Sequence, residues 1–181
     1  MTWNRIARRI RVPLGFIFAV FFLWLARPTL AYLAASLALV TPGLWLRGYA
    51  SGYVKKNAEL TATGPYAHTR NPLYLGSMLI AFGFALAAGS IWIAIALAAL
   101  FVAVYLPVIR SEEQYLRSVF PGFDAYAARV PRLLPRLTRV TGTVASASFS
   151  GALYRKHREY NALIGSVSLY AALILKWIFL K

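Results

Sequence analysis

Long apolar stretches alternate with short polar and basic stretches along the whole chain. Five apolar runs come close to the roughly 20 residues that a helix needs to cross a bilayer. They cover about Arg11–Ala26, Pro28–Leu46, Pro72–Ala88, Ile91–Ile109 and Ala162–Leu180. Runs one and two meet at Arg27-Pro28, and only Gly89-Ser90 separates runs three and four, so each pair should form a tight helical hairpin. The pattern predicts a single all-α membrane domain over residues 1–181, with five transmembrane helices, two tight hairpins and cytoplasmic interfacial helices.

Composition narrows the class of protein further. Hydrophobic residues make up 60% of the chain and charged residues only 14%, which is typical of a membrane protein. The absence of Cys excludes disulfides and thiolate metal ligands, and the two His lack metal-ligand spacing, so we expect no metal site. The net charge of +15 flanks the apolar runs. We therefore expect anionic membrane lipids as partners, and no nucleic acid.

The positive charges also predict an orientation. Seventeen of the 20 Lys and Arg lie before run one, between runs two and three, or between runs four and five. That side should be cytoplasmic, which puts the N-terminus inside and the C-terminus outside, in a bacterial inner membrane. All five acidic residues and both His fall on the same side. Any chemistry is therefore expected at the cytoplasmic membrane boundary.

A polar stretch, "GPYAHTRNPLYLGS" at residues 64–77, opens the third run. Gly64-Pro65 marks a turn, and Pro72 suits the first turn of a helix. Helix N-termini attract anionic groups, and Arg70 lies just before this one. On spacing alone, the simpler reading is favoured: Arg70 reaches the headgroups and Tyr74 joins the aromatic belt.

Two further clusters lie on the cytoplasmic side. Glu112 and Glu113 follow the fourth run directly, and two acids at a membrane exit are costly unless they are paired. Ion pairing with nearby Arg and binding of a cation are equally compatible with the sequence. In "AYAARVPRLLPRL", residues 125–137, Pro131 and Pro135 break any helix, and aliphatic side chains alternate with Arg. This composition suits a surface anchor in the interface, or a lid over a site.

Taken in order, "GPYAHTRNPLYLG", a helical hairpin, "EE" and "RVPRLLP" resemble the integral-membrane methyltransferases. That family includes isoprenylcysteine carboxyl methyltransferases and phospholipid N-methyltransferases. Its signature is similar to G-x-Y-x-x-x-R-H-P-x-Y-x-G followed by a Glu pair. The resemblance covers about residues 55–135, and the tail resembles a bacterial branch with unassigned substrates.

The resemblance implies S-adenosyl-L-methionine as the cofactor and methyl donor, bound at the cytoplasmic side. The implied cofactor contacts are Glu59, Leu60, Thr61, Tyr66, Asn71, Pro72, Tyr74 and Glu112. Arg70 and Glu113 belong to the signature, and we consider them with His68 as catalytic residues. His68 or Glu113 would accept a proton if the acceptor were an amine.

This sequence departs from the family pattern at two positions. Asn71 replaces the His that precedes Pro, and because an amide cannot titrate, Asn71 is not a general base. Val108 stands where prenylcysteine enzymes carry an Arg facing the substrate carboxylate. A carboxylate substrate would therefore lack that partner here.

The sequence thus predicts S-adenosylmethionine-dependent O- or N-methyl transfer to a lipophilic small molecule or lipid. It leaves the acceptor and the oligomeric state open. The alternative is a non-enzymatic membrane protein that binds lipid or acts as a scaffold. A transporter is disfavoured because the apolar runs carry almost no charged residues near their centres.

Overall fold

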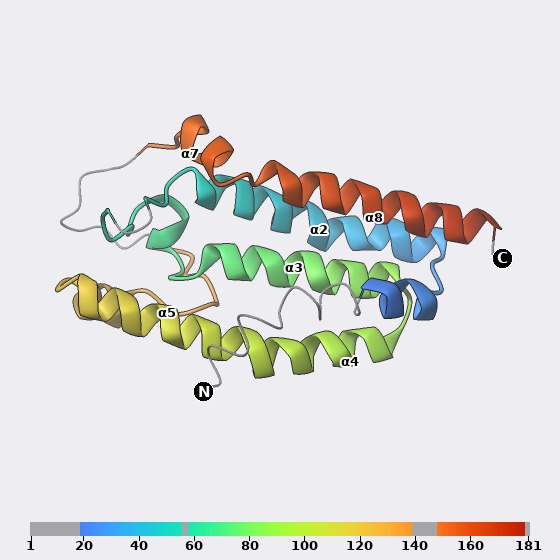
Figure 1. Cartoon of the computed structure of the whole chain (residues 1–181), viewed down its shortest axis with the longest axis horizontal. Coiled ribbons are helices and arrows are strands. Elements are labelled where there is room, and N and C mark those ends of the chain that lie inside the picture. Colours follow the sequence, from blue (N-terminus) through green and yellow to red (C-terminus); the bar gives the residue numbers. More distant parts are fainter. Residues whose placement is uncertain (1–18, 56–57, 139–147, 180–181) are drawn as a thin grey trace. The chain divides into compact units, whose positions relative to one another are not determined.

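The computed structural model describes residues 19–55, 58–138 and 148–179, and no strand occurs within these ranges (Figure 1). Residues 19–25 are helical. The longer elements are α2 (Leu30–Ser51), α3 (Pro72–Ala87), α4 (Ile91–Leu100), α5 (Leu106–Val119) and α8 (Tyr160–Phe179). The shorter ones are η1 (Gly64–Ala67), η2 (Phe101–Tyr105), α6 (Phe123–Arg129) and α7 (Gly151–Lys156).

Three described helices are long and apolar enough to cross a membrane. They are Leu30–Ser51 with 22 residues, Ile91–Val119 with 29 and Tyr160–Phe179 with 20. These correspond to the second, fourth and fifth predicted runs. The third run forms α3, which has only 16 residues and therefore rises about 24 Å, less than a hydrocarbon core of about 30 Å. The first run lies largely outside the described residues, so five crossings stay a prediction.

The chain divides into two compact units. Unit 1 comprises Met1–Val40, Ala81–Glu113 and Ser166–Lys181, and unit 2 comprises Thr41–Ile80 and Gln114–Gly165. The prediction of one domain over the whole chain is not tested by this division.

In unit 1, the turn before α2 contacts the turn between α3 and α4. The amide of Arg27 donates to the carbonyl of Ala88 over 2.7 Å. The helical segment 19–25 ends just before Arg27, and α4 begins three residues after Ala88. One backbone bond therefore joins two turns that the sequence predicts as separate hairpin tips.

Helices α2, α3 and α8 also meet in unit 1 around a buried hydroxyl. Ser36 donates to the carbonyl of Leu33 over 2.6 Å, and its oxygen lies 2.7 Å from the hydroxyl of Tyr170. Because Ser36 has a single hydroxyl proton, Tyr170 must be the donor in the second bond. The Tyr170 ring packs on Phe84 with centroids 4.8 Å apart. Both hydroxyls are thus satisfied in an apolar region, where an unpaired polar group would be costly.

The long helix Ile91–Val119, made of α4, η2 and α5, contains a π-helical stretch at η2. Buried positions are spaced five residues apart across it, at Val104 and Ile109, and then four residues apart, at Ile109 and Glu113. Pro107 follows the stretch closely, and its ring cannot donate to the preceding turn. A widened turn at this place relieves the crowding that Pro107 would cause in a regular helix.

Candidate functional site

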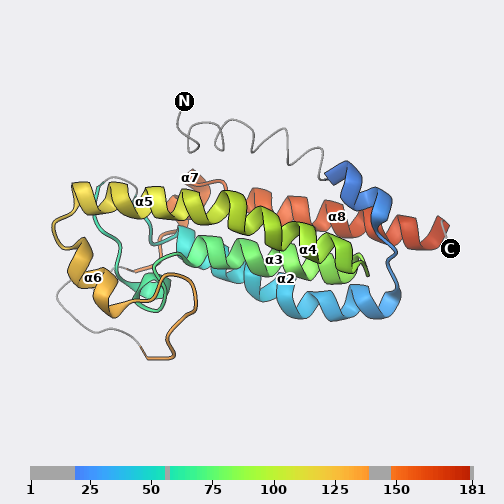
Figure 2. The same ribbon diagram turned by 90° about the horizontal axis from the view of Figure 1, so that it is seen from below.

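In unit 2, the Gly64-Pro65 turn before α3 folds as the short helix η1, and Gly64 makes this possible. Gly64 has φ +59°, and a Cβ added there would lie 2.6 Å from the ring of Tyr53. Tyr66, at the centre of η1, is buried with Ala50 and Tyr53 and packs near Leu73. The turn is therefore held against the end of α2 by aromatic packing. Figure 2 shows α6 beside η1, and the hydroxyl of Tyr126 donates to the carbonyl of Tyr66 over 2.8 Å.

Residues 68–71, which we call the motif loop, are bonded to residues 130–137, which we call the arginine–leucine segment. The bonds between them include Arg70 N to Pro131 O at 2.9 Å, Arg136 N to His68 O at 2.9 Å, Thr69 Oγ1 to Leu133 O at 3.0 Å, and Asn71 Nδ2 to Arg132 O at 3.0 Å. Asn71 thus uses its amide to hold the segment. A titrating group is not needed for that role, which fits the replacement of His by Asn at this position.

His68 is fixed in one tautomer by the same segment. Its Nδ1 lies 2.7 Å from the carbonyl oxygen of Arg136. A carbonyl only accepts, so Nδ1 must carry the proton. In the neutral ring, Nε2 is then left with its lone pair and is able to accept a proton.

Arg70 contributes to the framework around the loop as well as to the predicted site. Its Nη1 donates to the carbonyl of Ala127 on α6 over 3.3 Å. The predicted contacts that follow are Pro72, which is fully buried, and Tyr74, which is half-buried in the first turn of α3. The structure therefore brings Tyr66, Arg70, Asn71 and Pro72 together around the start of α3.

The predicted contacts before the turn have mixed environments. Glu59 is exposed and pairs with Lys55 over 3.1 Å, four residues away. Leu60 is half-buried. The hydroxyl oxygen of Thr61 is buried and has no hydrogen-bond partner among the described residues. A buried hydroxyl without a partner is unfavourable, so this atom is suited to receive a group from a ligand.

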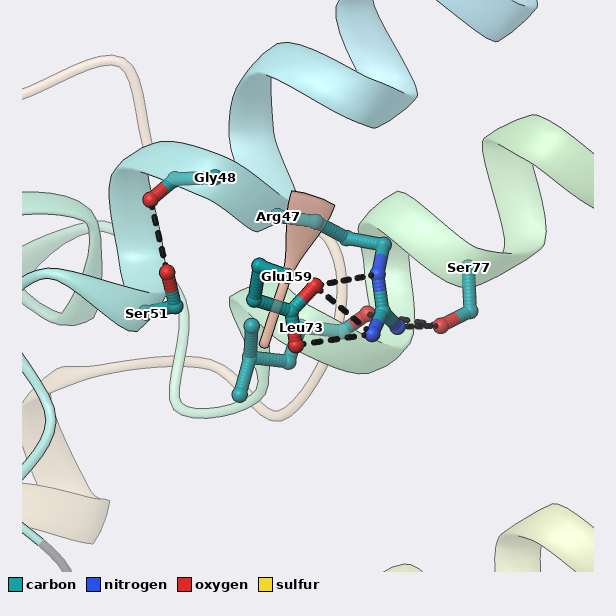
Figure 3. A network of polar contacts seen from close by, with 6 residues as sticks. All are labelled: Arg47, Gly48, Ser51, Leu73, Ser77 and Glu159. Atoms are coloured by element: carbon teal, nitrogen blue, oxygen red, sulfur yellow. Dashed lines mark hydrogen bonds and ion pairs between the residues drawn. The ribbon is translucent and has the colours of Figure 1, made fainter. Parts of the chain in front are cut away.

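A polar network that joins α2, α3 and the turn before α8 was not predicted as part of the site (Figure 3). Arg47 binds the carboxylate of Glu159 with Nε–Oε2 at 3.1 Å and Nη2–Oε1 at 3.0 Å. Its Nη1 donates to the hydroxyl of Ser77 and to the carbonyl of Leu73. The carbonyl of Leu73 lies in the first turn of α3, between Pro72 and Tyr74. The sequence places Glu159 with the other four acids on the side predicted to be cytoplasmic, but nothing there indicates its partner.

Gly76 makes room for this network. A Cβ at Gly76 would lie 2.7 Å from Cγ of Arg47 and 2.8 Å from the carbonyl oxygen of Gly43. The Gly at the end of the "LYLG" motif is therefore required by the close approach of α2 and by the stem of Arg47.

The predicted acidic pair belongs to unit 1, at the end of its share of α5. Glu112 is exposed, whereas Glu113 is buried, with 7% of its surface exposed. Neither carboxylate belongs to a potential metal site, because no three His, Cys, Asp or Glu gather within the described ranges.

Comparison with known proteins identifies the family. The phospholipid methyltransferase family model matches residues 30–122. The chain is 40% identical over 125 residues to the cobalt-zinc-cadmium resistance protein CzcN of Cupriavidus metallidurans, a match that covers 67% of this chain and 56% of that protein. It is 39% identical over 116 residues to the nickel-cobalt-cadmium resistance protein NccN of Alcaligenes xylosoxydans xylosoxydans, which covers 64% of this chain and 54% of that protein.

The chain thus spans about half the length of the curated relatives it matches. No solved structure matches it. The family match includes the turn, the motif loop, the hairpin after it and the Glu pair, and it covers more than half of the chain. By this match, and with helices long and apolar enough to span a bilayer, the chain is a membrane protein of the phospholipid methyltransferase family.

Proposed function

We propose that this protein transfers a methyl group from S-adenosylmethionine to a lipophilic or membrane-delivered acceptor at the cytoplasmic face of the membrane. Membership of the phospholipid methyltransferase family supports the reaction class. The apolar helices support an acceptor that arrives through the bilayer. The acceptor is a lipid or a lipophilic small molecule, and the atom methylated is oxygen or nitrogen.

The buried hydroxyl of Thr61 is the observation that carries this proposal. It lies in the segment that the family resemblance assigns to the cofactor, and within the described residues it has no hydrogen-bond partner. Nearby in the sequence, Tyr66 and Pro72 are buried, and Asn71 is held by the arginine–leucine segment. The residues present therefore fit a polar ligand that supplies the missing bond to Thr61.

The chemical groups of the cofactor match the side chains proposed to bind it. S-Adenosylmethionine supplies an electrophilic methyl group on a sulfonium, and it also carries an ammonium and a carboxylate. The ring faces of Tyr66 and Tyr74 suit a cationic group. The backbone N–H groups at the start of α3 suit the carboxylate. We assign the ammonium to Glu112 on the family resemblance alone.

The contribution of the chain to the reaction is alignment and exclusion of water. An anionic or neutral nucleophile approaching a sulfonium loses or disperses charge, which a dry pocket favours. No covalent intermediate with the protein is required, in keeping with a sequence that has no Cys. If the acceptor is an amine, we assign the role of proton acceptor to His68 through Nε2, or to Glu113.

We also propose the full membrane topology predicted from the sequence. Five crossings would arise if residues 11–26 form the first and α3 the third, with two hairpin tips outside. The N-terminus would be cytoplasmic and the C-terminus outside, in a bacterial inner membrane. The distribution of Lys and Arg supports this orientation.

The names of two relatives suggest a biological setting. CzcN and NccN are called metal-resistance proteins. We propose that this chain contributes to metal resistance by methylating a membrane component. Expression in a metal-sensitive bacterium should then raise the tolerated cadmium concentration, and Glu112→Ala should abolish that gain. A gain that Glu112→Ala leaves intact would contradict the link to methyl transfer.

Binding of the cofactor tests the proposed enzyme directly. Purified protein in detergent should bind labelled S-adenosylmethionine, and Glu112→Ala and Tyr74→Ala should each weaken binding at least about tenfold, the loss expected for one charge-assisted contact. Asp124→Ala is the matched control, because this acid is exposed and pairs with Arg117 outside the predicted contacts. If wild-type protein bound no cofactor, the alternative of a non-enzymatic lipid-binding or scaffold protein would replace this proposal.

A further inference from the structure

Two leucines in the arginine–leucine segment are almost fully open to the surroundings. Leu134 is 79% exposed and Leu137 is 99% exposed. The segment has no regular secondary structure that would place them against a core. Exposing a leucine to water forfeits about 1.5–3 kcal/mol compared with burying it, so two such side chains close together favour an apolar contact.

The charges around these leucines have one sign. Arg129 ends α6, and Arg132 and Arg136 lie within the segment. The guanidinium of Arg136 donates to the carbonyl of Arg129 over 2.7 Å, and this neutral acceptor leaves the positive charge uncancelled. The sequence has no acid between Asp124 and Glu159. An anionic surface is therefore the complement of this segment.

The position of the segment in unit 2 indicates which surface that is. Its carbonyls and amides are bonded to the motif loop, which leads directly into α3. Helix α3 is an apolar helix that begins at Pro72. The leucines and arginines thus lie at the start of an apolar helix of a membrane protein, where apolar side chains meet lipid headgroups.

We propose that the arginine–leucine segment docks on the anionic headgroups of the bilayer. Leu134 and Leu137 enter the headgroup–acyl boundary, and Arg129 and Arg136 bind lipid phosphates. Because the same segment holds the motif loop through its backbone, docking also fixes the geometry of residues 68–71. Docking itself is independent of the proposed function, whereas its importance for the methyl donor rests on that function.

The natural absence of Cys provides a clean experiment. Single variants Leu134→Cys and Leu137→Cys carry an environment-sensitive dye in nanodiscs, with a nitroxide quencher attached to the lipids. The control is Ser118→Cys, an exposed position in the polar end of α5. With phosphatidylcholine plus about 30% phosphatidylglycerol, quenching at both leucine positions should exceed that at Ser118 at least about twofold. Equal quenching at the three positions would overturn the proposal.

The contribution of charge is tested by lipid composition and by Arg129. Quenching at position 137 should fall when pure phosphatidylcholine replaces the anionic mixture. Arg129→Gln should shift the docking equilibrium about fivefold toward the undocked form, and Arg129→Lys should not. If quenching at position 137 changed neither with lipid charge nor with Arg129→Gln, the leucines would insert without headgroup binding by the arginines, which would contradict the proposal.

Amide exchange tests the link to the motif loop. The amide of Arg70 donates to Pro131 in the segment, and the amide of Arg136 donates to His68 in the motif loop. Hydrogen exchange of both amides should therefore slow when anionic lipid is added. Unchanged exchange despite strong quenching would refute the coupling. Failure of S-adenosylmethionine binding with quenching intact would refute only the enzyme, which keeps the two proposals separable.

Discussion

Arg47 and Glu159, which are 112 positions apart in the sequence, form a bidentate ion pair (Figure 3). The family match contains Arg47 but ends well before Glu159. The pair therefore attaches the turn before α8, which belongs to the unmatched part of the chain, to helix α2. Through Leu73 and Ser77, the same guanidinium also holds the first turns of α3.

Breaking this pair should destabilise the protein. The side chains of Arg47 and Glu159 are 24% and 11% exposed, so removal of one charge leaves the other poorly hydrated. We expect Glu159→Gln to lower the free energy of unfolding by about 1–3 kcal/mol, measured by thermal unfolding in detergent. Arg117→Ala, which removes the exposed pair with Asp124, should change it by less than about 1 kcal/mol. Equal effects of the two variants would argue against a special role for Arg47.

Gly76→Ala should also destabilise the protein, because the new methyl group would meet a backbone oxygen and the stem of Arg47. Overpacking of this kind costs about 1–3 kcal/mol. Gly165→Ala in α8 is the control, since its Cβ would meet nothing within 4 Å and Ala favours a helix by up to about 1 kcal/mol. Thermal unfolding of both variants checks the prediction, which fails if Gly76→Ala is as stable as Gly165→Ala.

Thr61 and Thr69 offer a comparison between a ligand contact and a structural contact. Thr61→Val removes a buried hydroxyl that is bonded to no described residue, so stability without cofactor should be unchanged or higher, while affinity for S-adenosylmethionine falls about fivefold. Thr69→Val removes bonds to the carbonyls of Arg132 and Leu133 and should cost about 1–3 kcal/mol of stability. Measured stability and cofactor affinity of the two variants separate these roles. A loss of stability in Thr61→Val would place its hydroxyl in the framework.

Proton acceptance can be tested at His68 and Glu113. If the methyl acceptor is an amine, His68→Ala or Glu113→Gln should reduce turnover about 100-fold or more, because general base catalysis is typically of this size. Single-turnover rates with the acceptor identified by labelling give the measurement. Full turnover in both variants would end the assignment of a base to either residue. Because Nδ1 of His68 also binds the carbonyl of Arg136, stability of His68→Ala must be measured alongside.

The sequence predicted most of what depends on local pattern. The apolar runs correspond to α2, α3, α4–α5 and α8, because burial in lipid imposes length and composition on each helix separately. The motif order predicted the family, which the family match confirms. The pairing of Arg47 with Glu159 could not be predicted, since it depends on how distant segments pack. The attachment of the motif loop to residues 131–136 could not be predicted either. Most of its bonds involve backbone groups, which every residue carries and which therefore leave no mark in the sequence.

The π-helical stretch Phe101–Tyr105 sets the register of everything that follows it in the helix. It adds one residue to the turn, which rotates the later side chains by about 100° relative to a regular α-helix. Without it, the buried positions of Ile109 and Glu113 would be taken by Val108 and Glu112. One wide turn, placed well before the two neighbouring carboxylates, therefore decides which of them faces inward and which faces outward.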